Sequence, residues 1–199
     1  MYPLIRPALI LFVLLSAITG IIYPLATFAI AQVGFPAQAN GSIVKRGGQP
    51  IGSRLIGQAS DAPGLFQGRP SATSPTPYDG MASGGSNLGP SNPALAAAVT
   101  QRAERLHAAN PEASGAVPVE LVLASASGLD PDISPRAALW QAPRVARMRG
   151  LPLAQVRELV ARHTQPPVLG LFGEARVNVL ALNLALDDAR PGVEDNPRR

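Results

Sequence analysis

The sequence predicts an α+β protein in which one N-terminal membrane-spanning helix precedes a single compact domain of mixed helices and strands. Three observations support this fold class. Residues 7–33 form an uncharged apolar run, helical and strand-like patterns alternate after it, and a long Gly/Pro-rich loop interrupts those patterns. We expect a short tail at 1–6, the helix at 7–33, a lead-out at 34–50, the folded domain at 51–188 and a flexible tail at 189–199.

The apolar run is long enough to be a retained membrane anchor. A bilayer core about 30 Å thick needs roughly 20 apolar residues of helix. The alternative is a cleaved signal peptide that ends at Ala29-Ile30-Ala31, but such a peptide has a shorter apolar core of about 7–15 residues. Pro24 is expected to kink the helix. Ser16 and Gly20 lie four residues apart, a spacing that either allows another helix to pack closely or faces plain lipid.

The charges that flank the run predict its orientation. Arg6 and the amino terminus precede it, and the next charged residues are Lys45 and Arg46. Positive charge near a membrane helix favours the cytoplasmic side. We therefore expect a single-pass membrane protein with a cytoplasmic N-terminus and the bulk of the chain outside the cytoplasm.

The composition excludes several classes of function. The chain has no cysteine, 21 prolines, 19 glycines and a net charge of +4. Without cysteine there is no disulfide, thiol enzyme or cysteine-ligated metal. The basic residues form no dense blocks interleaved with aromatics, so we expect no nucleic-acid partner.

Local patterns predict the elements of the domain. Asn92 with Pro93, and Ser134 with Pro135, are typical of helix starts, and Gly150 is typical of a helix end. Within the closing stretch 176–188, residues 177–186 fit either an alternating strand or a helix, and their Ala and Leu content favours the helix. The remaining expectations are a strand at 51–58, no regular element at 59–93, a helix from Pro93 to Asn110, a buried strand at 117–124, a turn at 125–131, a helix at 135–149 kinked by Pro143, and a helix from Pro152 to about His163.

No catalytic or metal-binding constellation is present in the sequence. His107 and His163 are expected to be solvated helix residues, and no His-Glu-x-x-His or other metal-ligand spacing occurs. The turn holds Ser125, Ser127 and Asp130 but no Gly-x-Ser-x-Gly nucleophile motif. We expect these side chains to satisfy the backbone of their own turn.

The segment Ser83-Gly84-Gly85-Ser86-Asn87-Leu88-Gly89 is rich in glycine but lacks the lysine of a Walker phosphate loop. It is better interpreted as a specified turn or a contact loop. Gly84 and Gly85 permit positive φ, and Ser86 and Asn87 are able to bond back to the backbone. Read alone, the sequence indicates an anchored accessory or interaction protein.

Several stretches together resemble one family, the C subunit of the Kdp-type potassium-transporting ATPase of bacteria and archaea. The resemblance extends from the anchor to about Asp188. The stretches are Leu55-Ile56-Gly57-Gln58, Arg69-Pro70-Ser71-Ala72, the block from Ser83 to Pro93, Val117-Pro118, Leu121 to Ser125, Ser127 to Pro135, Gln141 with Arg144-Val145-Ala146, and Gly173-Glu174 with Arg176 to Leu180 and Leu182-Asn183. Ala126, Asp132, Pro143 and the single Phe66 depart from the usual pattern.

The resemblance implies a pump made of a channel-like potassium-translocating subunit, a P-type ATPase subunit and small membrane subunits. ATP, Mg and K+ belong to the complex. This chain is expected to be a non-catalytic subunit in a bacterial or archaeal cell (inner) membrane and to hold no metal. It would stabilise assembly and support ATP-driven potassium uptake, docking on the channel-like subunit. The alternative is a catalytic chaperone that takes part in nucleotide binding and raises the ATP affinity of the ATPase subunit.

The resemblance also supplies site candidates. For partner contact these are Arg69, Ser71, Ser83, Gly84, Gly85, Ser86, Asn87, Gly89, Pro90 and Asn92. Gln58 is the candidate for nucleotide contact. Ser127, Gly128, Asp130, Pro131, Ser134, Asn178 and Asn183 are expected to be structural residues of the family motif.

Overall fold

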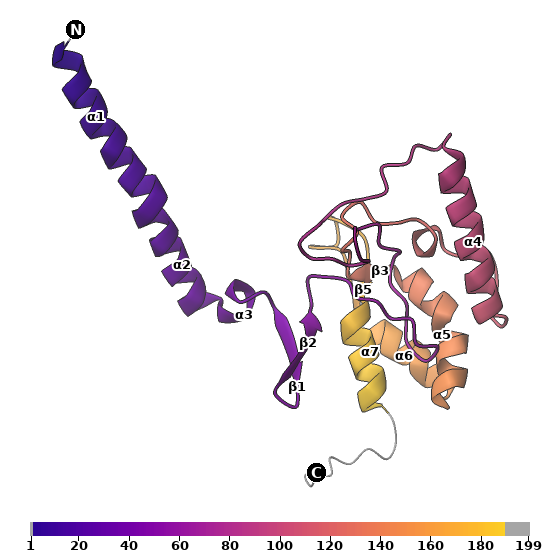
Figure 1. The fold of residues 1–199 in the computed structure, drawn as a ribbon. Helices are drawn as coiled ribbons and strands as arrows, with labels where there is room; N and C mark the ends of the chain where they lie inside the picture. The colour runs from indigo at the N-terminus through magenta and orange to yellow at the C-terminus, as the bar shows by residue number, and fades with distance from the viewer. Residues whose placement is uncertain (1, 190–199) are drawn as a thin grey trace. The chain divides into compact units, whose positions relative to one another are not determined.

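The computed structural model describes residues 2–189, so all but the first residue of the expected tail 189–199 lies outside the described residues. Contacts divide the chain into two units, residues 1–51 and residues 52–199. The first unit holds the apolar helix and most of a two-stranded hairpin, and the second holds a domain of helices around a small antiparallel sheet (Figure 1). The mixed helix and strand content that the sequence predicts is therefore confirmed.

The first unit begins with a nearly continuous helix that consists of α1 (Tyr2–Ala17), the π-helical turn η1 (Ile18–Ile22) and α2 (Tyr23–Gly34). The stretch Pro3–Gly34 is long and apolar enough to cross a membrane. Pro24 lies in the first turn of α2, directly after the π-helical turn. Proline has no N–H to donate within a helix, and a wider π turn is one way in which a helix adapts.

A short helix and a β-hairpin follow, and the second strand of the hairpin crosses the boundary between the two units. They are α3 (Pro36–Ala39), β1 (Ile43–Arg46) and β2 (Gln49–Ser53). Gly47 and Gly48 join the strands with φ of 56° and 82°, the backbone that a two-residue hairpin turn requires. The predicted strand at 51–58 is wrong in its bounds, because β2 starts earlier and ends at Ser53. Beyond it, the Gly57 amide donates to the Leu129 carbonyl and pairs with no strand.

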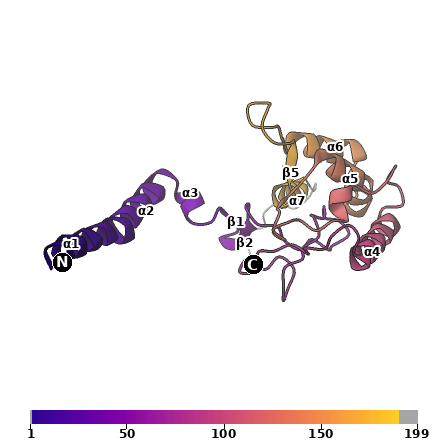
Figure 2. The ribbon, with the colours of Figure 1, turned by 90° about the horizontal axis from the view of Figure 1, so that it is seen from above.

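The second unit surrounds a three-stranded antiparallel sheet of order β3-β5-β4. Its strands are β3 (Asp132–Ile133), β4 (Thr164–Gln165) and β5 (Arg176–Asn178), and its α-helices are α4 (Pro93–Ala109), α5 (Pro135–Arg149), α6 (Leu153–Arg162) and α7 (Val179–Asp188). Val177 of β5 pairs with Ile133 on one side and with Thr164 on the other. Helices α5, α6 and α7 lie close together near this sheet (Figures 1 and 2).

Both predicted helix starts of the domain are confirmed. The Ala94 amide donates to Oδ1 of Asn92 at 2.9 Å, and the Ala137 amide donates to Oγ of Ser134 at 3.1 Å. Helix α5 ends at Gly150, which has the left-handed φ of 65°. It is assigned as one helix through Pro143. Residues 54–92 contain no helix or strand, as expected for 59–92 but not for 54–58.

The predicted strand at 117–124 is wrong. The segment forms the 3₁₀ turn η2 (Val119–Leu121), closed by local bonds such as that from the Leu121 amide to the Pro118 carbonyl. Leu121 and Val122 are buried while Val119 is exposed. An apolar run reports burial but not conformation, and here a single turn buries its two apolar side chains without a ladder partner.

The closing stretch 176–188, whose sequence fits a strand or a helix, contains one of each. Arg176–Asn178 forms strand β5 and Val179–Asp188 forms helix α7, so the helical alternative holds for most of it. The side chain of Asn178 makes the transition, because its Oδ1 accepts from the Ala181 amide and caps α7.

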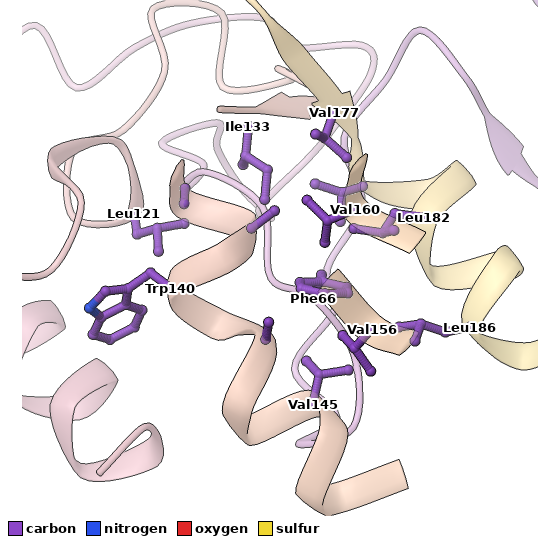
Figure 3. Packing of buried hydrophobic residues seen from close by; sticks show 14 of the residues in the cluster. Phe66, Leu121, Ile133, Trp140, Val145, Val156, Val160, Val177, Leu182 and Leu186 are labelled. Atoms are coloured by element: carbon purple, nitrogen blue, oxygen red, sulfur yellow. The ribbon is translucent and has the colours of Figure 1, made fainter. Parts of the chain in front are cut away.

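The core of this unit is built around Phe66, which comes from the long loop and not from a regular element. Phe66 is fully buried and lies among Val156, Val160 and Leu182 (Figure 3). The remaining labelled side chains come from α5, α7, β5 and the segments next to them. A segment of the loop therefore packs against the helices and supplies a side chain at the centre of the core.

Candidate functional site

The family-like segments of the loop and of the turn at 125–131 meet in the second unit. The Gly84 amide donates to the Ser127 carbonyl at 2.8 Å, and Oγ of Ser83 donates to the same carbonyl at 3.2 Å. The Ser125 amide donates to the Pro70 carbonyl at 3.3 Å. We call residues 69–73, 83–85 and 125–130 the loop–turn junction.

Glycines allow the backbones of the junction to approach closely. A Cβ on Gly128 would lie 2.6 Å from the Gly84 carbonyl oxygen and 2.6 Å from Cγ2 of Thr73. A Cβ on Gly85 would lie 2.9 Å from the Ala126 carbonyl oxygen. Gly84 and Gly85 permit positive φ but do not adopt it. The left-handed residue of the turn is Gly128, with φ of 68°, and that of the glycine-rich loop is Asn87, with φ of 52°. Glycine is needed at position 85 because a Cβ there would lie too close to the Ala126 backbone, and not because of its φ.

Arg69 lies within the junction and faces its own chain. Its Nη1 is 3.0 Å from Oδ2 of Asp130, and both side chains are roughly two-thirds buried. The other carboxylate oxygen, Oδ1, accepts from the Asp132 amide at 3.0 Å. One carboxylate thus closes the turn and holds the guanidinium, which leaves Arg69 less available to a partner than the sequence suggested.

The sequence analysis missed Tyr78 and Thr73, which organise the loop around Ser71. The Tyr78 amide donates to Oγ of Ser71 at 2.8 Å, and the Tyr78 hydroxyl donates to the Arg69 carbonyl at 2.7 Å. Oγ1 of Thr73 donates to the Thr76 carbonyl at 2.6 Å and accepts from the Asp79 amide at 3.0 Å. Burial raises the pKa of the Tyr78 phenol above 10.0, and the negative charge of Asp61 adds to the effect. Tyr78 is the only aromatic residue of the polar, proline-rich stretch 67–92, and this is the signal that could have identified it.

The second half of the glycine-rich loop is exposed. Ser86, Asn87, Gly89 and Pro90 all face solvent. In the described part of the chain, the side chains of Ser86 and Asn87 make no hydrogen bond, so the expected bonds back to the backbone are absent. The loop is therefore fixed at Gly84 and Gly85 and again at the Asn92 cap of α4, and it presents polar groups between those points.

The junction offers a nucleotide phosphate few free hydrogen-bond donors or positive charges. The Gly84 amide is already bonded to the turn, and Arg69, the basic residue of the junction, is paired with Asp130. Gln58 is half-buried, and its side-chain amide lies over Gly52, where a Cβ would come within 1.6 Å of Nε2.

The expected structural residues of the family motif connect elements. Ser134 bonds through its amide and its hydroxyl to the Glu120 carboxylate, which ties η2 to the start of α5. The Pro131 carbonyl accepts from the Val179 amide at 3.0 Å. Nδ2 of Asn178 donates to the Arg54 carbonyl at 3.0 Å and to Oδ1 of Asp132 at 3.1 Å.

Among residues 2–189 no group of three or more His, Cys, Asp or Glu side chains is placed to hold a metal ion. His107 lies edge-on to the Trp140 ring, with ring centroids 6.0 Å apart, and Nδ1 of His163 is 2.9 Å from the Leu159 carbonyl oxygen. Both histidines therefore have local structural contacts, and neither lies in the junction.

The family model described as "KdpC: K+-transporting ATPase, c chain" matches residues 5–188. The chain belongs to the KdpC family. The match covers the apolar helix, the loop–turn junction and the helices of the second unit alike.

Curated members of the KdpC family align over nearly the whole chain. A potassium-transporting ATPase KdpC subunit from Variovorax paradoxus is 66% identical over 92% of this chain and 95% of the relative. The KdpC subunit of Polaromonas naphthalenivorans is 62% identical over 94% and 96%, and that of Klebsiella pneumoniae is 56% identical over 92% and 96%. The KdpC relatives named here are bacterial proteins.

Proposed function

We propose that this chain is the non-catalytic C subunit of a potassium-transporting ATPase complex and that it stabilises the assembly of that complex. The proposal rests on its KdpC family membership and on one structural observation. The segment 86–91 is exposed and carries side chains without a hydrogen-bond partner in the described chain, yet it is held at both ends. Such a loop is pre-organised for contact, because little conformational entropy is lost when it binds.

We propose that the apolar helix anchors the chain in the bacterial cell membrane with the N-terminus in the cytoplasm. Arg6 is the only charged residue on the N-terminal side of the run, and it supports this orientation. The second unit then lies outside the cytoplasm, where it contacts the outer face of the channel-like subunit and not ATP.

Topology separates this role from nucleotide binding. A reporter enzyme that works only outside the cytoplasm is expected to be active when it is fused after Arg199. Activity of a reporter that works only in the cytoplasm would contradict the proposed orientation. That result would favour the alternative in which Gln58 or the glycine-rich loop takes part in nucleotide binding.

Assembly is tested at Ser86. The variant Ser86→Arg adds a bulky charge to the exposed loop and breaks no hydrogen bond of the described chain. We expect about tenfold weaker association with the other Kdp subunits, which corresponds to about 1.4 kcal/mol. The measurement is recovery of the co-expressed complex in detergent, together with its potassium-dependent ATPase activity.

The matched control is Ser114→Arg, since Ser114 is also an exposed loop serine without a hydrogen bond among the residues described. A second variant, Gly85→Val, places a Cβ against the Ala126 backbone and is expected to displace the loop. Full recovery and activity with Ser86→Arg would show that this loop is not the contact.

A further inference from the structure

The connection between β4 and β5 is unusually apolar for an exposed loop. We call residues 166–173 the apolar loop. The exposed fractions of its large side chains are 56% for Val168, 85% for Leu169, 81% for Leu171 and 65% for Phe172. Figure 2 shows the segment between α6 and β5 protruding from the second unit. Isolated exposed apolar residues are normal, whereas a contiguous group marks an interaction site.

No Asp, Glu, Lys or Arg occurs between His163 and Glu174. The loop is therefore free of the side chains that are most costly to transfer into hydrocarbon. Two prolines at its start, Pro166 and Pro167, also remove two backbone donors.

The backbone of the apolar loop satisfies most of its own donors. The Val168 amide donates to the Phe172 carbonyl at 2.9 Å, and the Phe172 amide donates back to Val168 at 3.0 Å. The Gly170 and Leu171 amides donate to carbonyls at the start of the loop. An unpaired backbone group costs several kcal/mol in lipid, so this bonding lowers the barrier to entry. Leu169 and Gly173 carry the only amides of the loop without a bond in the described structure.

The apolar side chains are exposed both on the two arms of the loop and at its tip. Val168 and Phe172 pair across an isolated antiparallel bridge. Leu169 and Leu171 lie in the turn that joins them, where Leu169 has the left-handed φ of 55°. All four are more than half exposed. A docking surface on another protein covers one face, whereas an apolar medium surrounds the loop and covers every side.

We propose that the apolar loop inserts into the lipid bilayer in which we place the apolar helix. Residues 35–51 connect the apolar helix to the second unit, and even a fully extended connector of this length reaches only roughly 60 Å. The folded unit therefore stays near the membrane from which the helix emerges. Insertion would give the chain a second membrane contact and limit how far the second unit rotates on its connector. The inference rests on the proposed membrane anchoring.

The chain has no cysteine, so single cysteines are labelled without background. The full-length variants Leu171→Cys, Met81→Cys and Leu14→Cys, each with an environment-sensitive fluorophore, are reconstituted into phosphatidylcholine vesicles that contain lipid with a nitroxide on the acyl chain. Met81 is the matched water-exposed control, with an exposed fraction of 95%. Leu14 reports on the anchor itself.

We expect the labels at residues 171 and 14 to lose about half of their emission, since the nitroxide lies in the hydrocarbon core about 30 Å thick, while the label at 81 keeps its emission. Quenching at 14 but not at 171 overturns the loop insertion and leaves the anchor intact. Quenching at 171 but not at 14 supports insertion and overturns the anchor, and no quenching at either overturns both. A label at 171 that is shielded only after the other Kdp subunits are added also overturns lipid insertion, and it assigns the loop to a protein partner.

Discussion

Asn183 of α7 pairs with both backbone polar groups of Phe66. The Phe66 amide donates to Oδ1 of Asn183 at 2.8 Å, and Nδ2 of Asn183 donates to the Phe66 carbonyl at 3.0 Å. Both residues are buried, so no water replaces these bonds. The amide side chain acts like a neighbouring strand and allows an irregular loop to place a phenyl ring at the centre of the core.

Replacing Asn183 with Leu is expected to destabilise the domain by about 2–4 kcal/mol, because two buried backbone groups lose their partners and each costs about 1–3 kcal/mol. The measurement is urea unfolding of the full-length chain in detergent, followed by fluorescence. Trp140 is the only tryptophan and is buried in the second unit, so the signal reports on this domain alone. Gln101→Ala, on the exposed face of α4, is the control; equal stability of the two variants would refute the pairing.

A second amide repeats this arrangement one residue along the loop. The Gln67 amide donates to Oε1 of Gln141 at 2.9 Å, and Nε2 of Gln141 donates to the Gln67 carbonyl at 3.0 Å. Arg144, one turn further along α5, donates to the carbonyls of Pro63 and Leu65 and to Oδ1 of Asn110. Nε of Arg149, also on α5, donates to the Gly64 carbonyl at 2.6 Å. The strap at 63–67 is thus held by four side chains from two helices.

Arg144 is buried and is surrounded by neutral oxygen acceptors. Burial, together with the positive charge of Arg147, lowers the pKa of Arg144 to about 10, so the guanidinium remains charged near neutral pH. Arg144→Met is expected to cost about 2–4 kcal/mol, because the carbonyls of Pro63 and Leu65 lose their donor. Urea unfolding followed by Trp140 fluorescence measures the change.

The matched control for this substitution is Arg147→Met on the same helix. The Arg147 side chain is 44% exposed and pairs with Glu112, an arrangement that contributes less than about 1 kcal/mol. Its removal also relieves repulsion with Arg144. Comparable losses for the two variants would mean that the strap does not depend on the buried guanidinium.

The helices of the second unit were predictable because their signals are local. Asn92 and Ser134 cap helices, and Gly150 ends one, through contacts within a few residues. The strap was not predictable, since the bonds from Asn183 and Gln141 reach across long sequence separations to a loop without any periodicity. The 3₁₀ turn at Val119–Leu121 was mistaken for a strand for a related reason: an apolar run does not reveal whether a ladder partner exists.

The sequence groups the residues of the loop–turn junction into one motif but does not give their contacts. Sequence likeness identified Arg69 and Gly85 as part of one motif. Only the structure shows that Arg69 pairs with Asp130 and that Gly85 lies against the Ala126 backbone. Motif residues that hold the fold and motif residues that meet a partner have the same appearance in a sequence.

Gly128→Ala is expected to be strongly destabilising for two reasons that a control can separate. A side chain at positive φ costs of order 1–3 kcal/mol, and the added Cβ would also lie 2.6 Å from the Gly84 carbonyl oxygen. Gly115 has φ of 81° with nothing within 4 Å of its Cβ position, so Gly115→Ala pays only the conformational cost. Chemical unfolding of both variants should show the larger loss at Gly128, and equal losses would remove close approach as the reason for glycine in the turn.

The Tyr78 phenol predicts a specific dependence of stability on alkaline pH. Burial and the charge of Asp61 raise its pKa above 10.0 in the folded chain. Between pH 10.0 and that raised value, the folded chain retains a proton that the unfolded chain has lost. Unfolding then releases a proton, so the free energy of unfolding falls as pH rises through this window, while at lower pH the phenol contributes no slope.

The measurement for Tyr78 is urea unfolding at a series of alkaline pH values, compared between the natural chain and Tyr78→Phe. The substitution removes the proton and also the hydrogen bond to the Arg69 carbonyl, which contributes about 0.5–1.5 kcal/mol. We therefore expect Tyr78→Phe to be less stable at neutral pH but to lose less stability above pH 10.0. Parallel pH profiles for the two proteins would show that the phenol titrates alike in the folded and unfolded chains, and that its burial does not perturb it.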